Sequence, residues 1–306
     1  MHGVLIIDKP ADITSHDVVR RLRRLLKIRR IGHAGTLDPM ATGVLQVAVG
    51  EGTRLVEFLM QGEKTYRAVL RLGETTDTQD AEGKVVERRP VPAFGREEID
   101  AVCRSFTGRI RQIPPMYSAL KKNGVSLHRL ARQGIEVERE AREIEIRALR
   151  ILAVDLPLIT LEVDCSKGTY IRTLAHDIGA ALGPGAHLTA LRRLRSGSFT
   201  EADSISLDDL EAADPADGCP GMLSLLEAMR GYPRLAVNDN AASRLQNGVP
   251  PKIEETTGER PQTGECLLLL HREELLAVAR FDPDHCWESR GDFALQRVFP
   301  HLKAQR

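Results

Sequence analysis

The stretch GHAGTLDPMATGVL (residues 32–45) contains one carboxylate and no Lys or Arg. Asp38 stands directly before Pro39, and a residue before proline is pushed out of the helical region into extended backbone. Glycines on both sides of the aspartate let the loop bend. The sequence therefore predicts a carboxylate held extended on a glycine-hinged loop, a placement that suits a nucleophile. The alternative is an ordinary Asp-Pro turn, which implies no chemistry.

Three other residues favour chemistry at Asp38. Arg172 lies at the start of a predicted helix in KGTYIRT, and an arginine beside Asp38 would keep the carboxylate ionised. Tyr66 and Tyr170 are two of only four tyrosines, and each flanks a segment of this candidate site. Taken alone, each tyrosine is better explained by packing in the core.

Signatures of other chemistries are missing from the sequence. It has no GxxxxGK[ST] phosphate loop, no GxGxxG after a strand and no HExxH zinc motif. The five cysteines form no CxxC pair, and the nine histidines show no ligand spacing. We therefore expect no cofactor and no metal.

The sequence also lacks the patterns of membrane and secreted proteins. No apolar run approaches the roughly 20 residues of a membrane span. The N-terminus MHGVLIIDKP has no basic segment followed by a long apolar one, as a secretory signal would. We expect a cytoplasmic protein with no membrane partner.

Strand and helix patterns alternate along the first two thirds of the chain. Residues 64–73 alternate strictly, with Tyr66 and Leu70 on one face and Arg67 and Arg71 on the other. The other predicted strands span 3–8, 44–49, 143–155 and 158–165, and the predicted helices span 15–28 (with Ser15 as N-cap), 53–60, 97–107 and 170–182. The pattern indicates mixed α and β structure.

The formal net charge of zero hides three charged blocks. Residues 1–35 carry eight Lys and Arg against three Asp and Glu, and residues 101–150 carry eleven against five. Residues 201–260 reverse the balance, with five against twelve. Each basic block alone is as well explained by a solvated helix face, but two of them flanking Asp38 favour a nucleic-acid partner.

The composition of the sequence changes near residue 212. AADPADGCPG is typical of a linker, and one more helix is expected before Tyr232. Beyond it, ECLLLLHREELLAVARF predicts two strands joined by a tight polar turn, and FALQRVF predicts another. We expect a large domain at residues 1–231 and a small β-rich module at residues 232–306.

Four long motifs, in order from about residue 3 to 200, resemble the bacterial tRNA pseudouridine-55 synthase (TruB) family. They are LIIDKPADITSHDVVRRLRRLLKIRRIGHAGTLDPMATGVLQVAVGEGTRL, KTYRAVLRLGETTDTQDAEG, QIPPMYSALKKNGVSLHRLARQGIEVERE and VDCSKGTYIRTLAHDIGAALGPGAHLTALRRLRSG. The resemblance implies an α+β catalytic domain, with a mixed, mostly antiparallel sheet flanked by helices. It also implies that the C-terminal module is a PUA-like RNA-binding module.

The resemblance implies a reaction and a set of site residues. The family isomerises uridine 55 in the T-arm loop of tRNA to pseudouridine, moving the glycosidic bond from N1 to C5 of a flipped base without a cofactor. Lys9, in the family's DKP motif, is interpreted as structural or RNA-facing rather than catalytic. The other matches are Asp38 as the catalytic aspartate, Arg172 as its partner, Tyr66 stacking on the uracil, Tyr170 and Leu191 lining the pocket, and His33 engaging the RNA loop.

Residues 111–142 help to choose among related enzymes. Guide-RNA-dependent synthases resemble the same catalytic motifs but lack this insertion, whose basic residues suit a grip on a tRNA arm. We therefore expect a monomer that acts alone on tRNA, with no obligate protein partner. A guide-RNA-dependent subunit and a non-catalytic tRNA-folding chaperone stay open as alternatives. The expected RNA-binding residues of the insertion are Lys121, Lys122, Arg129 and Arg132.

Overall fold

The chain forms two compact units. A computed structural model describes residues 1–118, 120–122, 124–213, 218–284 and 291–299. One unit is Leu5–Met222, and the other is Met1–Val4 together with Leu223–Arg306. The division falls before the expected boundary at 231/232 because Leu223 pairs with Val4 in a β-bridge. Helix α7 (Leu225–Ala228) also packs on strand β18 (Glu274–Phe281) of the smaller unit.

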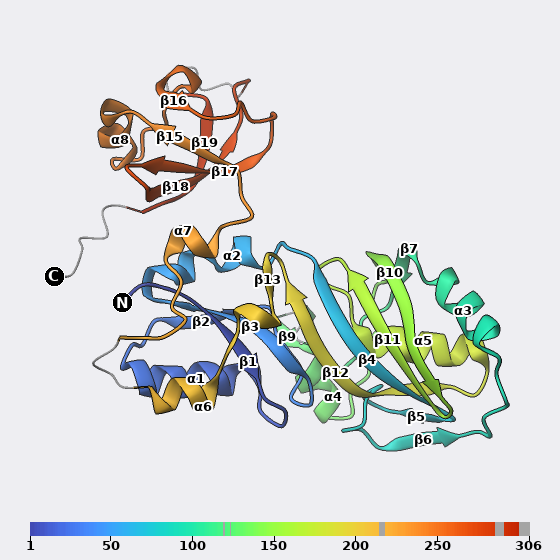
Figure 1. The fold of residues 1–306 in the computed structure, drawn as a ribbon. Coiled ribbons are helices and arrows are strands. Elements are labelled where there is room, and N and C mark those ends of the chain that lie inside the picture. The colour runs from blue at the N-terminus through green and yellow to red at the C-terminus, as the bar shows by residue number, and fades with distance from the viewer. Residues whose placement is uncertain (119, 123, 214–217, 285–290, 300–306) are drawn as a thin grey trace. The chain divides into compact units, whose positions relative to one another are not determined.

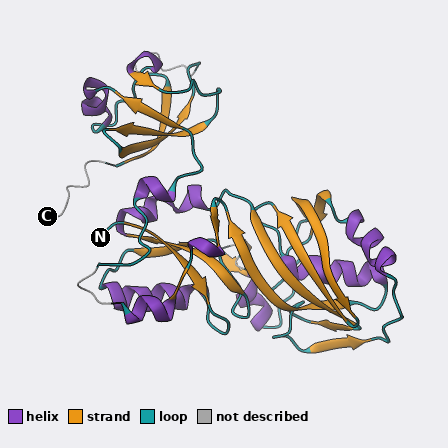
Figure 2. Ribbon diagram, in the orientation of Figure 1, coloured by secondary structure: helices purple, strands orange, loops and turns teal. Residues whose placement is uncertain are grey.

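The larger unit is built on a mixed sheet (Figures 1 and 2). Its strands are β1 (Gly3–Lys9), β2 (Ile31–Ala34), β3 (Thr42–Val49), β4 (Lys64–Leu72), β7 (Gly108–Gln112), β10 (Arg142–Asp155), β11 (Leu158–Cys165), β12 (Ala186–Ser196), β13 (Phe199–Thr200) and β14 (Ile205–Ser206). The order is β14-β1-β3-β12-β4-β11-β10-β7, with β2 beside β3 and β13 beside β12. Parallel pairs join β1 to β14 and β12 to β3, and antiparallel pairs dominate the rest, which confirms the expected sheet.

Helices cover this sheet and connect its strands. They are α1 (Ser15–Leu26), α2 (Val56–Leu59), α3 (Arg96–Ser105), α4 (Leu127–Arg132), α5 (Ile171–Leu182) and α6 (Leu207–Ala212). Helix α5 packs on β12 and β4, and α3 packs on α5 and β10. Two small hairpins lie outside the sheet, β5 (Glu74–Thr76) with β6 (Val85–Arg88), and β8 (Lys121–Lys122) with β9 (Val125–Ser126).

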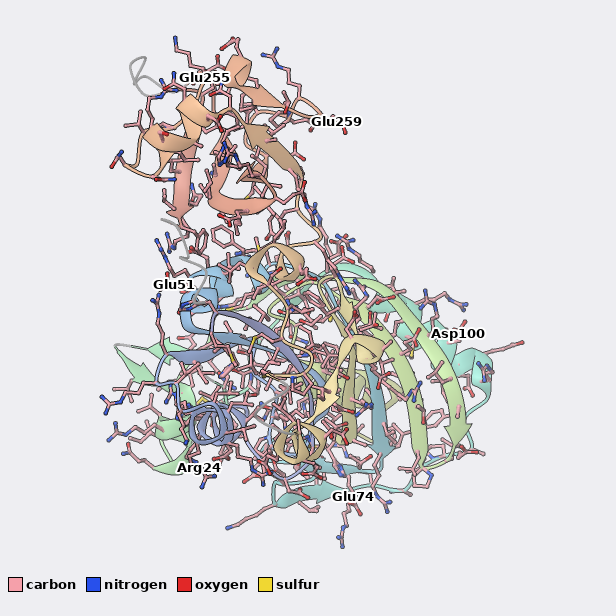
Figure 3. All side chains as sticks on the ribbon, turned by 60° about the vertical axis from the view of Figure 1, so that its left-hand side comes forward. Arg24, Glu51, Glu74, Asp100, Glu255 and Glu259 are labelled. Carbon is pink, nitrogen blue, oxygen red and sulfur yellow. The ribbon has the colours of Figure 1, made fainter. Side chains whose placement is uncertain are left out.

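Helix α1 shows how the sequence fixes a boundary. The prediction of Ser15 as its N-cap is wrong, because Thr14 caps the helix and forms a capping box with Asp17. Ser15 is buried instead, and its hydroxyl bonds to the loop that carries Asp38. Val18, Val19 and Leu22 face the core, while Arg24 projects from the opposite side (Figure 3).

The smaller unit has its own sheet and core. Its strands are β15 (Arg234–Val237), β16 (Thr256–Thr257), β17 (Cys266–His271), β18 and β19 (Phe293–Val298), in the order β16-β15-β17-β18-β19. The expected tight turn joins β17 to β18 through Arg272 and Glu273, both of which have positive φ. Helix α8 (Asp239–Leu245) adds Ala241, Ala242 and Leu245 to the core. In the parts of the chain that the structure describes, no helix has the length and apolar character to cross a bilayer.

Candidate active site

The loop that carries Asp38 is fixed at its base by α1. The Ser15 hydroxyl donates to the carbonyl of Leu37 at 3.2 Å and accepts from the Leu37 amide at 2.9 Å. The amide of Ala41 donates to the carbonyl of Asp38 at 3.1 Å, which closes a turn. The backbone around the carboxylate is therefore held by specific bonds, and Asp38 opens the Asp-Pro turn that the sequence offered as the alternative.

Lys9 supports the same loop from the end of β1. Its side chain is fully buried, and Nζ donates to the carbonyls of Pro10, Ile13 and Pro39 at 2.8, 2.6 and 3.0 Å. Burial lowers the pKa of Lys9 to about 8, against the opposing charge of Asp12. Because all its donors face carbonyls, Lys9 acts on the structure of the loop, which agrees with the structural interpretation.

Asp38 and Arg172 form a two-pronged ion pair. Arg172 Nε lies 2.9 Å from Asp38 Oδ2, and Arg172 Nη2 lies 3.2 Å from Asp38 Oδ1. The arginine side chain is 5% exposed and the aspartate side chain 33% exposed, so the carboxylate is the accessible member. Such paired contacts fix orientation as well as charge. The prediction that the two residues meet is confirmed by these distances.

Arg172 has further partners that the sequence did not predict. Its Nη1 lies 3.3 Å from Asp80 Oδ2, and the Asp80 side chain is only 3% exposed. Nη1 also donates to the carbonyl of Thr78 at 3.2 Å, and Nη2 to that of Tyr117 at 2.7 Å. Arg172 lies in the first turn of α5, where the helix dipole disfavours a cation, so the two carboxylates offset an unfavourable position.

The surroundings act on the ionisation of Asp38 in opposite directions. Burial raises the pKa of its carboxyl, and the negative charge of Asp80 adds to this effect. The ion pair with Arg172 lowers the same pKa. The net result is a pKa above the ordinary value of an aspartate, and Arg172 limits that rise and so favours the charged form that a nucleophile needs.

Tyr66 lies in β4 beside the loop. It is 8% exposed and belongs to the same hydrophobic cluster as Leu37 and Leu191. Burial raises the pKa of its hydroxyl and the negative charge of Asp38 also raises it, whereas Arg193 lowers it. Leu191, paired with Ala68 across β12 and β4, lies on the same face. The structure therefore brings Tyr66 and Leu191 together in one cluster with Leu37, the residue before Asp38.

Tyr170 is the N-cap residue of α5. Its backbone amide donates to Gln112 Oε1 at 2.8 Å, and its backbone carbonyl accepts from Gln112 Nε2 at 3.0 Å. Burial raises the pKa of the Tyr170 hydroxyl, and the charge of Asp38 contributes in the same direction. Gln112 thus ties the start of the insertion to the residue before Arg172's helix.

His33 lies on β2, which leads into the loop. Its Nδ1 is buried, and within the described residues it has no hydrogen-bond partner. Burial lowers the pKa of His33, and the positive charges of Arg193 and His16 lower it further. No hydrogen bond or ion pair joins it to Asp38 in the described part of the chain. The imidazole therefore lies on the strand that leads into the loop, in surroundings that disfavour its charged form, and one of its nitrogens has no partner among the described residues.

The insertion contains the hairpin of β8 and β9 followed by α4. Leu127 is buried at 4%, whereas His128 and Arg129 are exposed, as expected for a short amphipathic helix. The side chains of the other three predicted RNA contacts, Lys121, Lys122 and Arg132, lie outside the described part of the structure. The insertion also delivers the carbonyl of Tyr117 to Arg172.

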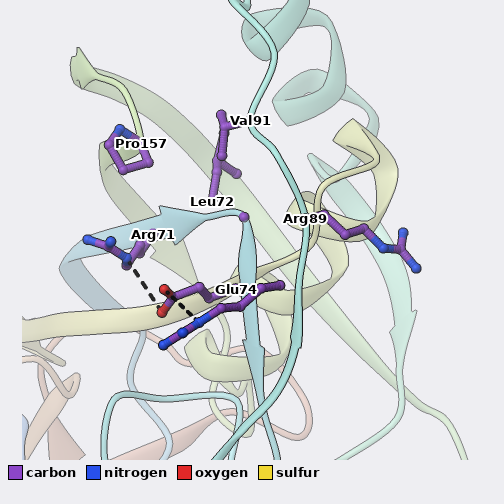
Figure 4. Close-up of a pocket in the computed structure, with 8 residues that line it drawn as sticks. Arg71, Leu72, Glu74, Arg89, Val91 and Pro157 are labelled. Atoms are coloured by element: carbon purple, nitrogen blue, oxygen red, sulfur yellow. Dashed lines mark ion pairs between the residues drawn. The ribbon is translucent and has the colours of Figure 1, made fainter.

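A separate cavity lies at the far end of β4. It has a volume of about 210 Å³, and Leu72, Val91 and Pro157 line its apolar side (Figure 4). Arg71 and Arg88 reach Glu74 there, with Nε to carboxylate distances of 3.6 and 3.4 Å. None of the residues predicted for the active site lines this cavity.

Sequence models of known families match most of the larger unit. The TruB family pseudouridylate synthase N-terminal domain matches residues 23–171. The tRNA pseudouridylate synthase B C-terminal domain matches residues 172–218, a range that ends before the smaller unit.

Whole-chain comparisons agree with these matches. The chain is 51% identical to tRNA pseudouridine synthase B of Syntrophotalea carbinolica over 98% of both chains. It is 47% identical to the protein of the same name from Geobacter sulfurreducens, over 91% of this chain and 93% of that one. Among solved structures, the crystal structure of a Cbf5-Nop10-Gar1 complex matches with a TM-score of 0.75 and 29% identity, over 97% of this chain and 84% of that chain. The chain belongs to the TruB family of pseudouridylate synthases.

Proposed function

We propose that this protein converts uridine 55 in the T-arm loop of tRNA to pseudouridine. The observation that carries the proposal is the accessible Asp38 carboxylate held on Arg172, with the buried ring of Tyr66 packed in the same cluster as Leu37, the residue before Asp38. The names of the relatives, which are tRNA pseudouridine synthases, support the choice of tRNA as substrate. We extend the proposal to a monomeric cytoplasmic enzyme whose smaller unit, a PUA-like module, helps to bind RNA.

The proposed reaction is an isomerisation that needs no oxidant or reductant. The target nucleotide leaves the RNA stack, at a cost of a few kcal/mol that contacts in the pocket offset. Asp38 attacks the pyrimidine ring or ribose C1′, the bond from C1′ to N1 breaks, and a bond from C1′ to C5 forms. The bond between Asp38 and the nucleotide breaks again, which regenerates the free carboxylate. The proton on C5 is lost and N1 gains one, so atoms and electrons balance. In this proposal Tyr66 holds the uracil by stacking, and its hydroxyl takes part in the proton transfer.

The direct test uses an unmodified tRNA transcript and the protein alone. The mixture contains an excess of chelator, and pseudouridine is mapped along the product. Modification confined to the T-arm loop uridine supports the proposal. Modification elsewhere, or none, contradicts it.

The likeness to Cbf5 keeps a guide-RNA-dependent subunit as the second candidate. Two observations favour the stand-alone enzyme: the 51% identity to a tRNA pseudouridine synthase B, and the insertion that carries α4. The two candidates differ in one requirement. Product formed on the bare transcript excludes a need for guide RNA or partner proteins, and product formed at all excludes an idle tRNA-folding chaperone.

Substitutions of Tyr66 separate stacking from proton transfer. Tyr66→Phe should keep tRNA binding, because the ring remains and base stacking is worth about 1–3 kcal/mol. Tyr66→Leu loses the ring and should reduce the single-turnover rate at saturating tRNA far more than Tyr66→Phe reduces affinity. Rates are measured per folded protein, since Tyr66 is also part of the core. Normal turnover by Tyr66→Leu would return this residue to a packing role.

The basic residues of the insertion should set affinity rather than chemistry. Replacing Lys121, Lys122, Arg129 and Arg132 together by Gln should weaken tRNA binding and flatten its salt dependence. Each lost contact to a duplex arm removes about 0.9 from the slope of log K against log salt. The single-turnover rate at saturating tRNA should fall much less. A variant with Arg96 and Arg104 of α3 replaced serves as the control. An unchanged salt slope in the fourfold variant would show that these basic residues do not contact the RNA.

A further inference from the structure

Arg193 is a buried arginine that differs from its neighbours on β12. Arg192 lies 2.8 Å from Asp8 and Arg195 lies 3.3 Å from Asp164, so both have carboxylate partners. Arg193 is 1% exposed, and in the described part of the chain no carboxylate lies within ion-pair distance of it. Burying a charge is costly unless it is paired or hydrogen-bonded. Its position therefore depends on the groups that its guanidinium contacts.

Three of those groups are backbone carbonyls on both sides of Asp38. Arg193 Nε donates to the carbonyl of Val44 at 2.7 Å. Nη2 donates to the carbonyl of Gly35 at 3.2 Å and Nη1 to that of Thr36 at 3.4 Å. Gly35 and Thr36 precede Asp38 and Val44 follows it, so one planar group joins the two ends of the loop. A guanidinium suits this role because its donors diverge in a fixed plane.

The backbone of the same residue holds the loop as well. Arg193 pairs with Gly43 in the parallel register of β12 and β3. Gly43 has φ +98°, and a Cβ placed there would lie 2.3 Å from the carbonyl oxygen of Arg193. The glycine is therefore required by close approach as well as by conformation. Both the side chain and the main chain of Arg193 fix the end of the loop to β12.

On its other side Arg193 faces Tyr66. The two residues are cross-strand partners in β12 and β4, and such partners have their side chains on the same face. We propose that Arg193 is a positioning residue, which clamps both ends of the Asp38 loop against the strand that carries Tyr66. This inference rests on the proposed function, because it assigns Arg193 the task of setting where Asp38 meets the bound uracil. The positive charge of Arg193 also opposes the rise that burial causes in the pKa of Tyr66.

The test is Arg193→Lys, with Arg195→Lys as the control on the same strand, because the Arg195 side chain contacts Thr65 and Asp164 and not the Asp38 loop. Lysine keeps the charge, but its compact ammonium cannot span three carbonyls that lie in different directions. The single-turnover rate at saturating tRNA should fall about 100-fold, the effect expected when a reacting group is misplaced by an ångström. Affinity for tRNA should stay close to that of the wild type, because the Arg193 side chain is buried and therefore not on the surface that RNA would contact. Amide hydrogen exchange within residues 35–44 should become faster in Arg193→Lys and not in Arg195→Lys.

Each outcome decides the inference. A rate equal to that of Arg195→Lys, or unchanged exchange within 35–44, overturns it. Rate, affinity and melting temperature falling together would show a general structural role and also overturn it. If Arg193→Lys does not fold, Arg193→Gln gives the same comparison without leaving a charge unpaired. The exchange measurement needs no RNA, so it tests the clamp even if the wild type fails to modify tRNA and the proposed function falls.

Discussion

Asp38→Asn should abolish pseudouridine formation while leaving tRNA binding nearly intact. The amide is close in shape to the carboxylate, and the bonds that hold the loop come from Ser15, Lys9 and Arg193 rather than from the Asp38 side chain. An amide lacks the charge that makes the carboxylate a nucleophile. Loss of a group that forms the covalent intermediate costs about 10⁴-fold or more in rate. Most of the affinity comes from phosphate contacts elsewhere.

Single-turnover assays and a binding titration with the same transcript check this expectation. Asp100→Asn is the matched control, since Asp100 lies on α3 in an exposed pair with Arg104 (Figure 3). The control should turn over like the wild type. Detectable pseudouridine from purified Asp38→Asn would end the assignment of this carboxylate as the nucleophile. Loss of tRNA binding in this variant would show instead that the carboxylate is needed to hold the RNA.

Local sequence patterns predicted the elements of the site because each pattern reports on its own element. The alternation in residues 64–72 placed Tyr66 on the buried face of β4, and the structure confirms its burial. The Asp-Pro sequence predicted a constrained loop for the same reason: proline limits the backbone of its neighbour wherever it occurs. Where two capping residues stood side by side, at Thr14 and Ser15, the pattern did not choose correctly between them. The choice was made by Asp17, which completes a capping box with Thr14.

The partners across the site were not predictable, because they depend on which strands become neighbours. Asp80 follows the β5 strand, and only the bridge of Asp80 with Leu188 of β12 brings it to Arg172. Arg193 is one of three arginines in LRRLR (residues 191–195), and nothing in that stretch indicates that its role differs from the roles of Arg192 and Arg195. The three arginines differ because β12 lies between β3 and β4. In that position Arg193 contacts the backbone of the Asp38 loop, whereas Arg192 and Arg195 contact carboxylates. Residues that stand in a recognisable local pattern or motif, such as Tyr66 and Asp38, were therefore found, whereas Asp80 and Arg193, whose contacts depend on which strands become neighbours, were missed.

Arg172→Met should produce the second large effect, on rate and on stability together. Methionine fills much of the arginine's volume but leaves two carboxylates without their cation. Asp80, at 3% exposed, cannot return to water, whereas Asp38, at 33% exposed, can do so in part. Removing one member of a buried ion pair costs about 3–5 kcal/mol, and we expect the lower end of that range because of the exposure of Asp38. The single-turnover rate should fall by about 10²-fold or more, since Asp38 loses both orientation and charge stabilisation.

The dependence on pH distinguishes this account from a loss of packing. Burial already raises the pKa of Asp38, and Arg172 opposes that rise, so removing the arginine raises the pKa further. Asp38 must be ionised to attack, so kcat/KM should begin to fall at a higher pH in the variant than in the wild type as the solution is acidified. The deficit in unfolding free energy should be largest near neutral pH. It should shrink as pH falls, because protonated carboxyls no longer need a cation.

Arg150→Met provides the matched control for both measurements. Arg150 also contacts two carboxylates, Glu162 at 2.8 Å and Asp164 at 3.5 Å, but its side chain is 58% exposed. Exposed pairs of this kind are worth about 0–1 kcal/mol, so the control should lose little stability and no activity. Chemical denaturation across a pH series, together with pH profiles of kcat/KM, measures the difference. If kcat/KM of Arg172→Met begins to fall at the same pH as that of the wild type, the guanidinium charge has no effect on the pKa of Asp38. The arginine would then support the fold without changing the ionisation of Asp38.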